Sequence, residues 1–197
     1  MTVEKESAYG FRKYYPVRNP QKANNSFDFL ISNDESVIYK RNNNSSEIFS
    51  ELMKDKNKFE DFEKILSGSL FTPEMSSHIC KGFDLELDGS YKMKFLHGYR
   101  LDMLESYELD SSMINLIINQ IEILLNSLGK ANEANDFFGD WAAHNLVYSF
   151  EFSSIFNIDL EGFLMYRPLP EWADYNTVEE WLKSIITDLH ASLSVIE

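Results

Sequence analysis

The sequence contains a single cysteine, Cys80, and no long uninterrupted apolar run. One thiol cannot build an internal disulfide framework, so we expect Cys80 to be a buried small hydrophobe in a reducing compartment. The most apolar stretch, residues 113–128, is interrupted by Asn, Gln and Glu and cannot span a bilayer. The first ten residues are polar and charged, unlike a signal peptide. We therefore expect a soluble, cytoplasmic protein without a transmembrane segment.

Basic residues are scarce as well. The chain has 18 Lys and Arg against 32 Asp and Glu, a formal net charge of −14. This balance argues against a nucleic-acid partner or an anionic membrane surface, because both require a basic face. It is compatible with ATP, since Mg²⁺ neutralises the phosphates. The 197 residues, 44% of them hydrophobic, suffice for one domain or two small lobes with a proper core.

Glycine is missing where a nucleotide-binding protein often needs it, because none occurs between Gly10 and Gly68. A glycine-rich loop that cradles phosphates with its backbone amides is therefore not expected in its usual form. Walker, Rossmann and nucleophile-elbow motifs are absent too. The histidines lack metal-ligand spacing; they are His78, His97, His144 and His190.

The first half of the chain alternates between strand and helix patterns. Residues 27–32 and 36–41 are rich in aromatic and β-branched side chains and flank Asn33-Asp34-Glu35, which predicts a hairpin. A helix capped by Ser45 or Ser46 and a second helix over 57–66 should follow. Strands over 79–87 and 90–96 are expected around the turn Asp88-Gly89, with Gly98 ending the second strand.

The second half predicts two long helices around a short β segment. Apolar residues recur at helical spacing from Ser111 to Leu128, and Gly129 should stop that helix. Two strand-like pieces follow within residues 137–163. The last helix should begin at Thr177, with Glu180 completing a capping box. The whole pattern indicates an α+β protein.

Residues 138–163, FGDWAAHNLVYSFEFSSIFNIDLEGF, carry the chemistry. Asp140 and Asn145 lie five positions apart, and Asp159 follows within IDLEGF. Either piece alone is typical of turns at strand ends. Together they resemble the protein-kinase-like superfamily, especially its aminoglycoside and small-molecule kinase branch. That resemblance implies a compact two-lobed fold, with a small antiparallel β N-lobe containing one main helix (1–97) and a mostly helical C-lobe (98–197).

The resemblance also implies roles for these residues. Asp140 would be the catalytic base that orients the acceptor hydroxyl and accepts its proton. Asn145 and Asp159 would hold Mg²⁺, a hard ion that prefers such oxygen ligands. The chain departs from protein kinases at Glu161-Gly162, where they have Phe-Gly, and at Phe138, where they often have histidine.

The nucleotide-binding half is less distinctive. Lys40, in VIYKR, best matches the lysine that binds nucleotide phosphates, although Arg41 beside it competes. Its glutamate partner is Glu51 by a small margin over Glu47 and Glu63. A solvated strand edge would also explain a lone lysine.

Residues 91–98 are similar to a strand that enters the interlobe hinge. Adenine would be held there by the Lys94 carbonyl and the Leu96 amide, with Met93 at the back of the pocket. A half-buried edge strand would show the same alternation. In place of a glycine loop, phosphate contacts could come from Arg12, Lys13, Arg18 or Lys22.

The chain ends soon after Asp159, which leaves little sequence for docking a polypeptide and favours a small acceptor. We expect an ATP- and Mg²⁺-dependent phosphotransferase acting on a hydroxyl of a small molecule, sugar or glycan. A pseudokinase that serves as a binding or regulatory module is the first alternative, and a minimal effector-type protein kinase is the second. Four aromatic residues could be core or could stack on a sugar ring: Trp141, Phe163, Tyr166 and Trp172.

Overall fold

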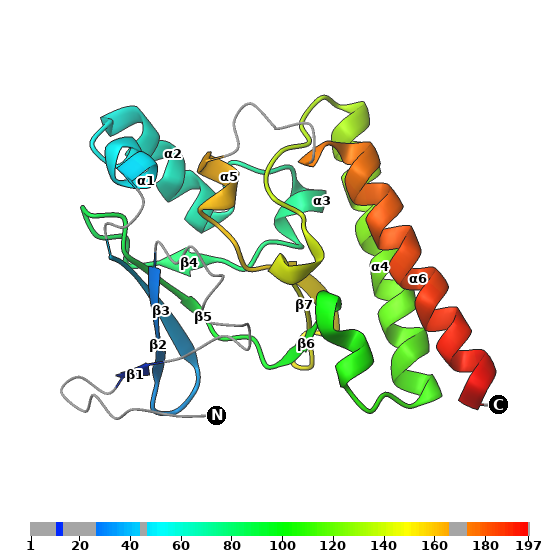
Figure 1. Cartoon of the computed structure of the whole chain (residues 1–197). Coiled ribbons are helices and arrows are strands. Elements are labelled where there is room, and N and C mark those ends of the chain that lie inside the picture. The colour runs from blue at the N-terminus through cyan, green and yellow to red at the C-terminus, as the bar shows by residue number, and fades with distance from the viewer. Residues whose placement is uncertain (1–10, 14–26, 44–46, 166–172, 197) are drawn as a thin grey trace. The chain divides into compact units, whose positions relative to one another are not determined.

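The computed structural model divides the chain into two compact units, each treated by itself (Figure 1). The first unit comprises residues 1–70 and 81–95, and the second comprises residues 71–80 and 96–197. Sequence reasoning divided the chain once, at 97/98, and left residues 71–80 with the first part. The α+β class is confirmed. The structure describes residues 11–13, 27–43, 47–165 and 173–196.

An antiparallel sheet forms the base of the first unit, with the strand order β1-β2-β3-β5-β4 in the described part of the chain. The expected hairpin over residues 27–41 is confirmed as β2 and β3. Asp34 shapes its turn by accepting hydrogen bonds from the hydroxyls of Ser32 and Ser36 at 2.6 and 2.8 Å. The strands are β1 (Phe11–Lys13), β2 (Phe27–Ser32), β3 (Val37–Asn42), β4 (Gly82–Phe83) and β5 (Tyr91–Lys94).

Two helices follow β3, namely α1 (Glu47–Leu52) and α2 (Lys56–Ser67). The Asp55 carboxylate caps α2 by accepting a hydrogen bond from the Asn57 amide, and Gly68 ends α2 in the left-handed conformation. Both helices agree with the sequence pattern. The expected caps of the first helix, Ser45 and Ser46, lie outside the described residues.

Aromatic rings join these helices to the sheet. Phe49 of α1 contacts Phe27 of β2 and Phe62 of α2 edge-on, with centroids 5.2 and 5.7 Å apart. Phe62 also contacts Tyr91 of β5 at 5.4 Å. Such edge-to-face pairs add specific geometry to apolar burial. This cluster is the core of the first unit.

The expected strand over residues 79–87 is wrong in most of its length. Only β4, Gly82–Phe83, pairs with β5, and the chain leaves the ladder at Asp84, which has a φ of 52°. A positive φ is incompatible with continued pairing, so the strand ends there. The turn itself is confirmed: Gly89 has a φ of 87°, and its amide donates to the Glu86 carbonyl.

In the second unit, α4 (Ser111–Glu133) and α6 (Tyr175–Ile196) run side by side in opposite directions (Figure 1). The sequence suggested that Gly129 ends α4, but the helix continues past it. A Cβ at Gly129 would lie 3.2 Å from the Tyr175 hydroxyl oxygen, so the glycine allows close packing against α6. No described helix is long and apolar enough to cross a membrane.

The expected start of the last helix also needs correction. The helix begins at Tyr175, two residues before Thr177. The Asp174 carboxylate accepts a hydrogen bond from the Thr177 amide at 2.8 Å, so Asp174 provides the cap. An aspartate and a threonine are both good capping residues, which is why the sequence pattern alone misplaced the boundary by two positions.

A small antiparallel sheet completes the second unit. Its order is β6-β7-β8 in the described residues, and Gly98 begins β6 where sequence reasoning ended a strand. The two expected strand-like pieces after α4 are confirmed as β7 and β8. The elements are α3 (Pro73–Ser76), β6 (Gly98–Arg100), η1 (Leu101–Ser106), η2 (Ala143–Asn145), β7 (Leu146–Ser149), β8 (Ser154–Asn157) and α5 (Gly162–Met165).

Candidate functional site

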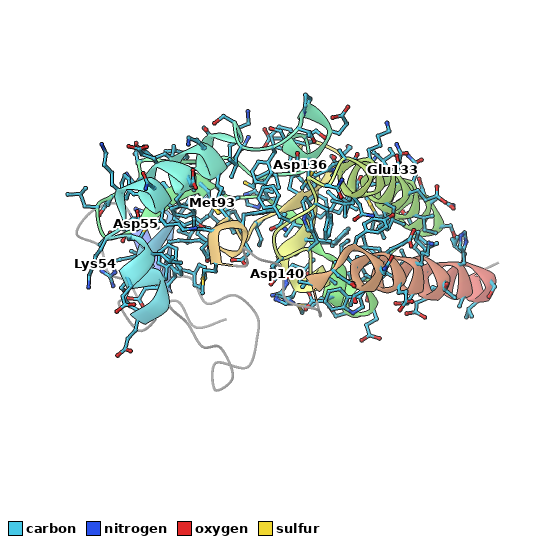
Figure 2. The ribbon with its side chains drawn as sticks, turned by 90° about the horizontal axis from the view of Figure 1, so that it is seen from above. Lys54, Asp55, Met93, Glu133, Asp136 and Asp140 are labelled. Carbon is cyan, nitrogen blue, oxygen red and sulfur yellow. The ribbon has the colours of Figure 1, made fainter. Side chains whose placement is uncertain are left out.

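Asp140, Asn145 and Asp159 all belong to the second unit, around the hairpin of β7 and β8. Asp140 lies on the loop that follows α4, beyond Glu133 and Asp136 (Figure 2). Asn145 ends η2 and leads directly into β7, whereas Asp159 comes just after β8. Because the strands are antiparallel, the start of β7 lies beside the end of β8.

A backbone contact joins the two ends of this hairpin. Leu146 pairs with Asn157, and the Ile158 amide donates to the Asn145 carbonyl at 2.9 Å. Residues 145 and 158 are therefore in direct contact despite their separation in sequence. The antiparallel pairing brings the expected metal-binding asparagine and aspartate to the same end of the hairpin.

Asn157, which sequence reasoning did not single out, connects the two aspartate segments. Its Nδ2 donates to the Asp140 carbonyl oxygen at 2.7 Å, and its Oδ1 accepts from the Asp159 amide at 2.8 Å. The side chain is fully buried, at 0% exposure. Both ends of one amide are thus satisfied by the backbone of the Asp140 segment and of the Asp159 segment.

Gly162 separates the two aspartate side chains. A Cβ at Gly162 would lie 2.5 Å from the Asp159 Oδ2 and 3.2 Å from the Asp140 Cβ. Both aspartates therefore flank the same Cα, and the missing side chain leaves them room. Gly162 follows Glu161, so the departure from Phe-Gly at this point keeps a glycine in the position where space is required.

The loop around Asp140 is held by local bonds and by an aromatic cluster. Asp140 is 6% exposed, and its Oδ1 accepts from the Ala142 amide at 3.0 Å. The preceding Gly139 has a φ of 93°, and a Cβ there would overlap the ring of Phe163. Glycine is thus required at 139 by conformation and by space.

Rings fill the volume beneath this loop. Phe163 contacts Phe71, Phe138 and Trp141, with centroids 4.9 to 5.7 Å apart. Trp141 and Phe163 are fully buried, so they serve as core and are not available to stack on an acceptor. The other two aromatic residues considered for that role, Tyr166 and Trp172, lie outside the described residues.

The Asn145 side chain has unused hydrogen-bonding capacity. Its Nδ2 is buried without a hydrogen-bond partner in the described structure, which is costly unless a bound group completes the site. Together with Asp159, it offers amide and carboxylate oxygens, the donors that Mg²⁺ prefers. No cluster of three or more His, Cys, Asp or Glu side chains suited to a metal occurs in the described parts of the chain. A Mg²⁺ ion bound here would have to keep several waters and phosphate ligands, because these two side chains do not form an all-protein cage.

Three other residues considered from the sequence also belong to the second unit. Glu161 is buried, His144 is half-buried within η2, and Cys80 is buried as expected. The Cys80 amide donates to the Asn157 carbonyl at 3.0 Å. Cys80 is thus part of the backbone that supports β8.

Lys40 lies in the first unit, on β3, and its side chain is on the buried face of the strand. It is 5% exposed, and its Nζ lies 5.6 to 6.0 Å from the ring centroids of Phe27, Phe29 and Tyr91. The neighbouring Arg41 is exposed and binds Asp28 at 2.8 Å. Lys40 is therefore the buried cation of the pair, and a solvated strand edge does not describe it.

The three glutamates considered as partners for Lys40 are Glu47, Glu51 and Glu63. All three are exposed, and none forms an ion pair with Lys40 in the described residues. For Glu51 the reason is the orientation of α1, which buries Phe49 and turns Glu51 outward, while Met53 just after the helix is buried as well. Within the described ranges, none of these three glutamates is therefore the ion-pair partner of Lys40.

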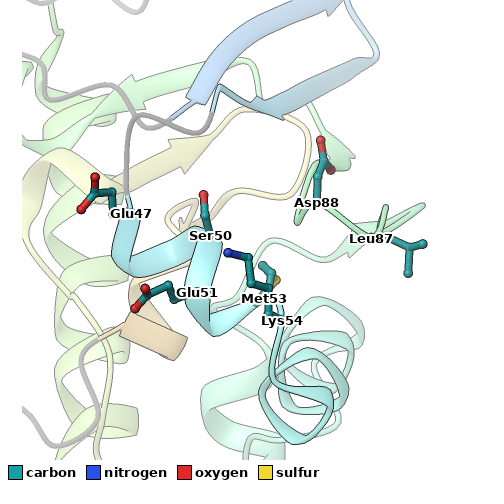
Figure 3. Close-up of a pocket in the computed structure, with 7 residues that line it drawn as sticks. All are labelled: Glu47, Ser50, Glu51, Met53, Lys54, Leu87 and Asp88. Carbon is teal, nitrogen blue, oxygen red and sulfur yellow. The ribbon is translucent and has the colours of Figure 1, made fainter.

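Glu51 instead lines an open pocket of about 620 Å³ beside α1 and the turn before β5 (Figure 3). The lining includes Glu47 and Asp88, against one lysine, Lys54. Such an acidic lining is unsuited to phosphate groups. We assign no role in nucleotide binding to this pocket.

The residues expected at the hinge lie at the end of the first unit and the start of the second. Met93 is buried in β5, and Lys94 ends the strand opposite Val37. Leu96 is half-buried and belongs to the second unit. The side chains of Arg12 and Lys13, and the whole of Arg18 and Lys22, lie outside the described residues.

No protein-family model matches this chain, and no curated protein matches it. The function is therefore inferred from the geometry of the residues themselves. Asn157, Gly139 and Gly162 are the structural supports of the site. The only sequence signal for Asn157 is a polar residue within the apolar run SIFNIDL.

Proposed function

We propose that this protein is an ATP- and Mg²⁺-dependent phosphotransferase with a small-molecule, sugar or glycan hydroxyl as acceptor. One observation carries the proposal: the β7–β8 hairpin gathers Asn145 and Asp159, and Asn157 links Asp159 to Asp140. A buried carboxylate beside oxygen ligands for a metal is what phosphoryl transfer requires, because the reaction depends mainly on positioning and charge stabilisation.

Each residue then has a distinct role. Asp140 would orient the acceptor hydroxyl and accept its proton. Asn145 and Asp159 would hold Mg²⁺, which supplies positive charge to the nucleotide phosphates when bound. Lys40 would add a further cation for those phosphates. The proposal includes a cytoplasmic location, where ATP is available and a lone thiol remains reduced.

A two-lobed, kinase-like architecture is part of the proposal. Its support is a first unit with an antiparallel sheet and inserted helices, and a second unit in which helices predominate. The pseudokinase alternative is favoured by one observation, the absence of glycine between Gly10 and Gly68. Without close backbone amides, phosphates must be held in another way.

The test measures Mg²⁺-dependent ATP binding by calorimetry and phosphate release or transfer with a panel of hydroxyl acceptors. We expect Asp140→Ala to lower turnover about 10³-fold with little change in nucleotide affinity. Asp159→Ala should weaken Mg²⁺-nucleotide binding about tenfold or more. Asp136→Ala, on the same loop, is the matched control and should behave as wild type.

Three outcomes separate the candidates. Wild-type protein that binds no nucleotide would remove both the enzyme and the nucleotide-binding pseudokinase. Binding without turnover on any acceptor, or in water, would favour the pseudokinase. Equal loss of nucleotide binding in Asp140→Ala and Asp159→Ala would contradict the roles assigned above.

A further inference from the structure

We infer that Asn157 is a positioning residue that sets the catalytic carboxylate and the metal-binding carboxylate in one fixed relation. This inference rests on the proposed function and assigns to Asn157 a part that the phosphotransfer motif does not contain. Asn157 touches neither the nucleotide nor the acceptor in the proposed mechanism. It acts through Asp140 and Asp159, whose backbones it joins.

The side chain of Asn157 makes two hydrogen bonds, one at each end of its amide. Nδ2 donates to the carbonyl of Asp140, and Oδ1 accepts from the amide of Asp159, at 2.7 and 2.8 Å. An aspartate, a leucine or a threonine in this place could not make both bonds in the same geometry. The two segments are otherwise separated by η2 and the whole hairpin.

Asn157 is itself held by hydrogen bonds to both polar groups of its backbone. Its amide donates to the His78 carbonyl at 2.7 Å, and its carbonyl accepts from the Cys80 amide at 3.0 Å. These bonds form a parallel bridge between Ile79 and Asn157, in addition to the pairing of Asn157 with Leu146. A residue held by two neighbouring segments is a rigid reference point for the groups that it binds.

Catalysis is sensitive to the placement of the two aspartate carboxylates. Reacting groups must be held within about 0.5 Å of the productive geometry, and supporting hydrogen bonds provide that precision. Full burial of Asn157 keeps water from replacing it in either bond. Loss of this amide would leave the Asp140 carbonyl and the Asp159 amide without their partner, and both aspartates would be free to shift.

The test compares Asn157→Leu with Ile155→Ala, a matched control on the same strand. Ile155 is fully buried and faces the same side of β8, but its side chain makes no bond to either aspartate segment. For Asn157→Leu we expect a 10- to 100-fold higher Mg²⁺ concentration for half-maximal ADP binding, and a similar loss of ATP hydrolysis. Ile155→Ala should lower the melting temperature without changing the Mg²⁺ requirement.

A double mutant tests whether Asn157 acts through Asp140. In the Asp140→Ala background and at saturating Mg²⁺, Asn157→Leu should cause little further loss of turnover, because the carboxylate that it positions is gone. Additive losses would contradict the inference. If Asn157→Leu does not fold, Asn157→Asp provides the second variant: it retains an oxygen for the Asp159 amide and loses the donor to Asp140. It should lose turnover more than Mg²⁺-dependent ADP binding.

The outcomes distinguish this inference from the proposed function. If wild-type protein binds Mg²⁺-ADP and hydrolyses ATP while Asn157→Leu differs from it no more than Ile155→Ala does, the function stands and the positioning role is wrong. Wild-type turnover in Asn157→Asp would also overturn it. If wild-type protein binds neither ADP nor ATP, the proposed function fails and the inference fails with it.

Discussion

The two units hold their candidate functional side chains by different forces. In the second unit, the Asp140 and Asp159 segments are joined by directional hydrogen bonds to one buried amide, that of Asn157. In the first unit, the Lys40 ammonium lies among three aromatic rings at 5.6 to 6.0 Å. Hydrogen bonds weaken steeply with misplacement, whereas ring packing tolerates adjustment. The difference predicts that substitutions around Asp140 and Asp159 act through geometry, whereas substitution of Lys40 acts through charge.

The largest effect should come from a change of loop geometry in the second unit. Gly139→Ala forces a side chain into a backbone with φ of 93° and into the ring of Phe163. We expect a loss of about 2–4 kcal/mol in the free energy of unfolding, from backbone strain and overpacking together. Urea unfolding followed by tryptophan fluorescence measures it, since all three tryptophans belong to the second unit.

Gly129→Ala is the matched control within the same unit. Gly129 lies inside α4, where alanine is favoured over glycine by about 1 kcal/mol. The new methyl group would meet the Tyr175 hydroxyl oxygen at 3.2 Å, which offsets part of that gain. The free energy of unfolding should therefore change by less than about 1 kcal/mol. If the two substitutions cost the same, the loop at Gly139 is not conformationally constrained.

The same pair of glycines marks what sequence could and could not predict. Gly139 belonged to the recognised motif, and periodicity correctly located the helix that contains Gly129. The predicted end of the helix at Gly129 was wrong, because one glycine lowers the stability of a long helix only slightly and close packing with Tyr175 offsets that loss. The outward orientation of Glu51 likewise depends on the burial of Phe49 and Met53 by the rest of the first unit.

The candidate site was predictable as a set of residues but not as a structure. Asp140, Asn145 and Asp159 were singled out by the resemblance of residues 138–163 to the kinase-like superfamily, and an antiparallel hairpin between the last two explains how Asn145 and Asp159 approach. Asn157 carried no comparable signal, because its importance lies in two hydrogen bonds made across the fold. Tertiary hydrogen bonds of this kind have no local sequence pattern.

A second prediction tests the proposed role of Lys40 in the first unit. Lys40→Met keeps a long flexible stem among Phe27, Phe29 and Tyr91 and removes the charge. We expect ATP affinity to fall about tenfold or more, and the free energy of unfolding to change less in proportion, because the methionine stem refills the volume among the three rings. Calorimetric titration and urea unfolding measure the two quantities.

Arg41→Met is the control for Lys40→Met. Arg41 is the adjacent cation on β3, exposed and paired with Asp28. Its loss should leave ATP affinity within about twofold of wild type, since exposed ion pairs contribute little. Equal losses of ATP affinity in both variants would show that overall charge, not the buried position of Lys40, determines nucleotide binding.

The smallest effect is a difference in pH dependence between the units. His78, in the second unit, is buried; its Nδ1 donates to the Ile155 carbonyl and its Nε2 lies 3.2 Å from the Ser127 hydroxyl. Burial lowers the pKa of His78 below its ordinary value of 6.5 in the folded protein. In the first unit, hydrogen bonds from Ser32 and Ser36 hold the pKa of Asp34 at about 2.

The direction in which stability changes with pH follows from proton uptake on unfolding. The unfolded chain protonates His78 near its ordinary pKa, whereas the folded chain does so only at lower pH. The contribution of His78 to the free energy of unfolding is therefore complete above pH 6.5 and declines as the pH falls below that value. Asp34 contributes down to a much lower pH, close to 2. Between about pH 7.5 and about pH 5.5, His78→Gln should therefore flatten the pH dependence of urea unfolding followed by tryptophan fluorescence. His190→Gln, an exposed position on α6, should leave that dependence unchanged. If His190→Gln flattened the pH dependence more than His78→Gln did, the buried His78 would not be the group that lowers the stability of the second unit at mildly acid pH.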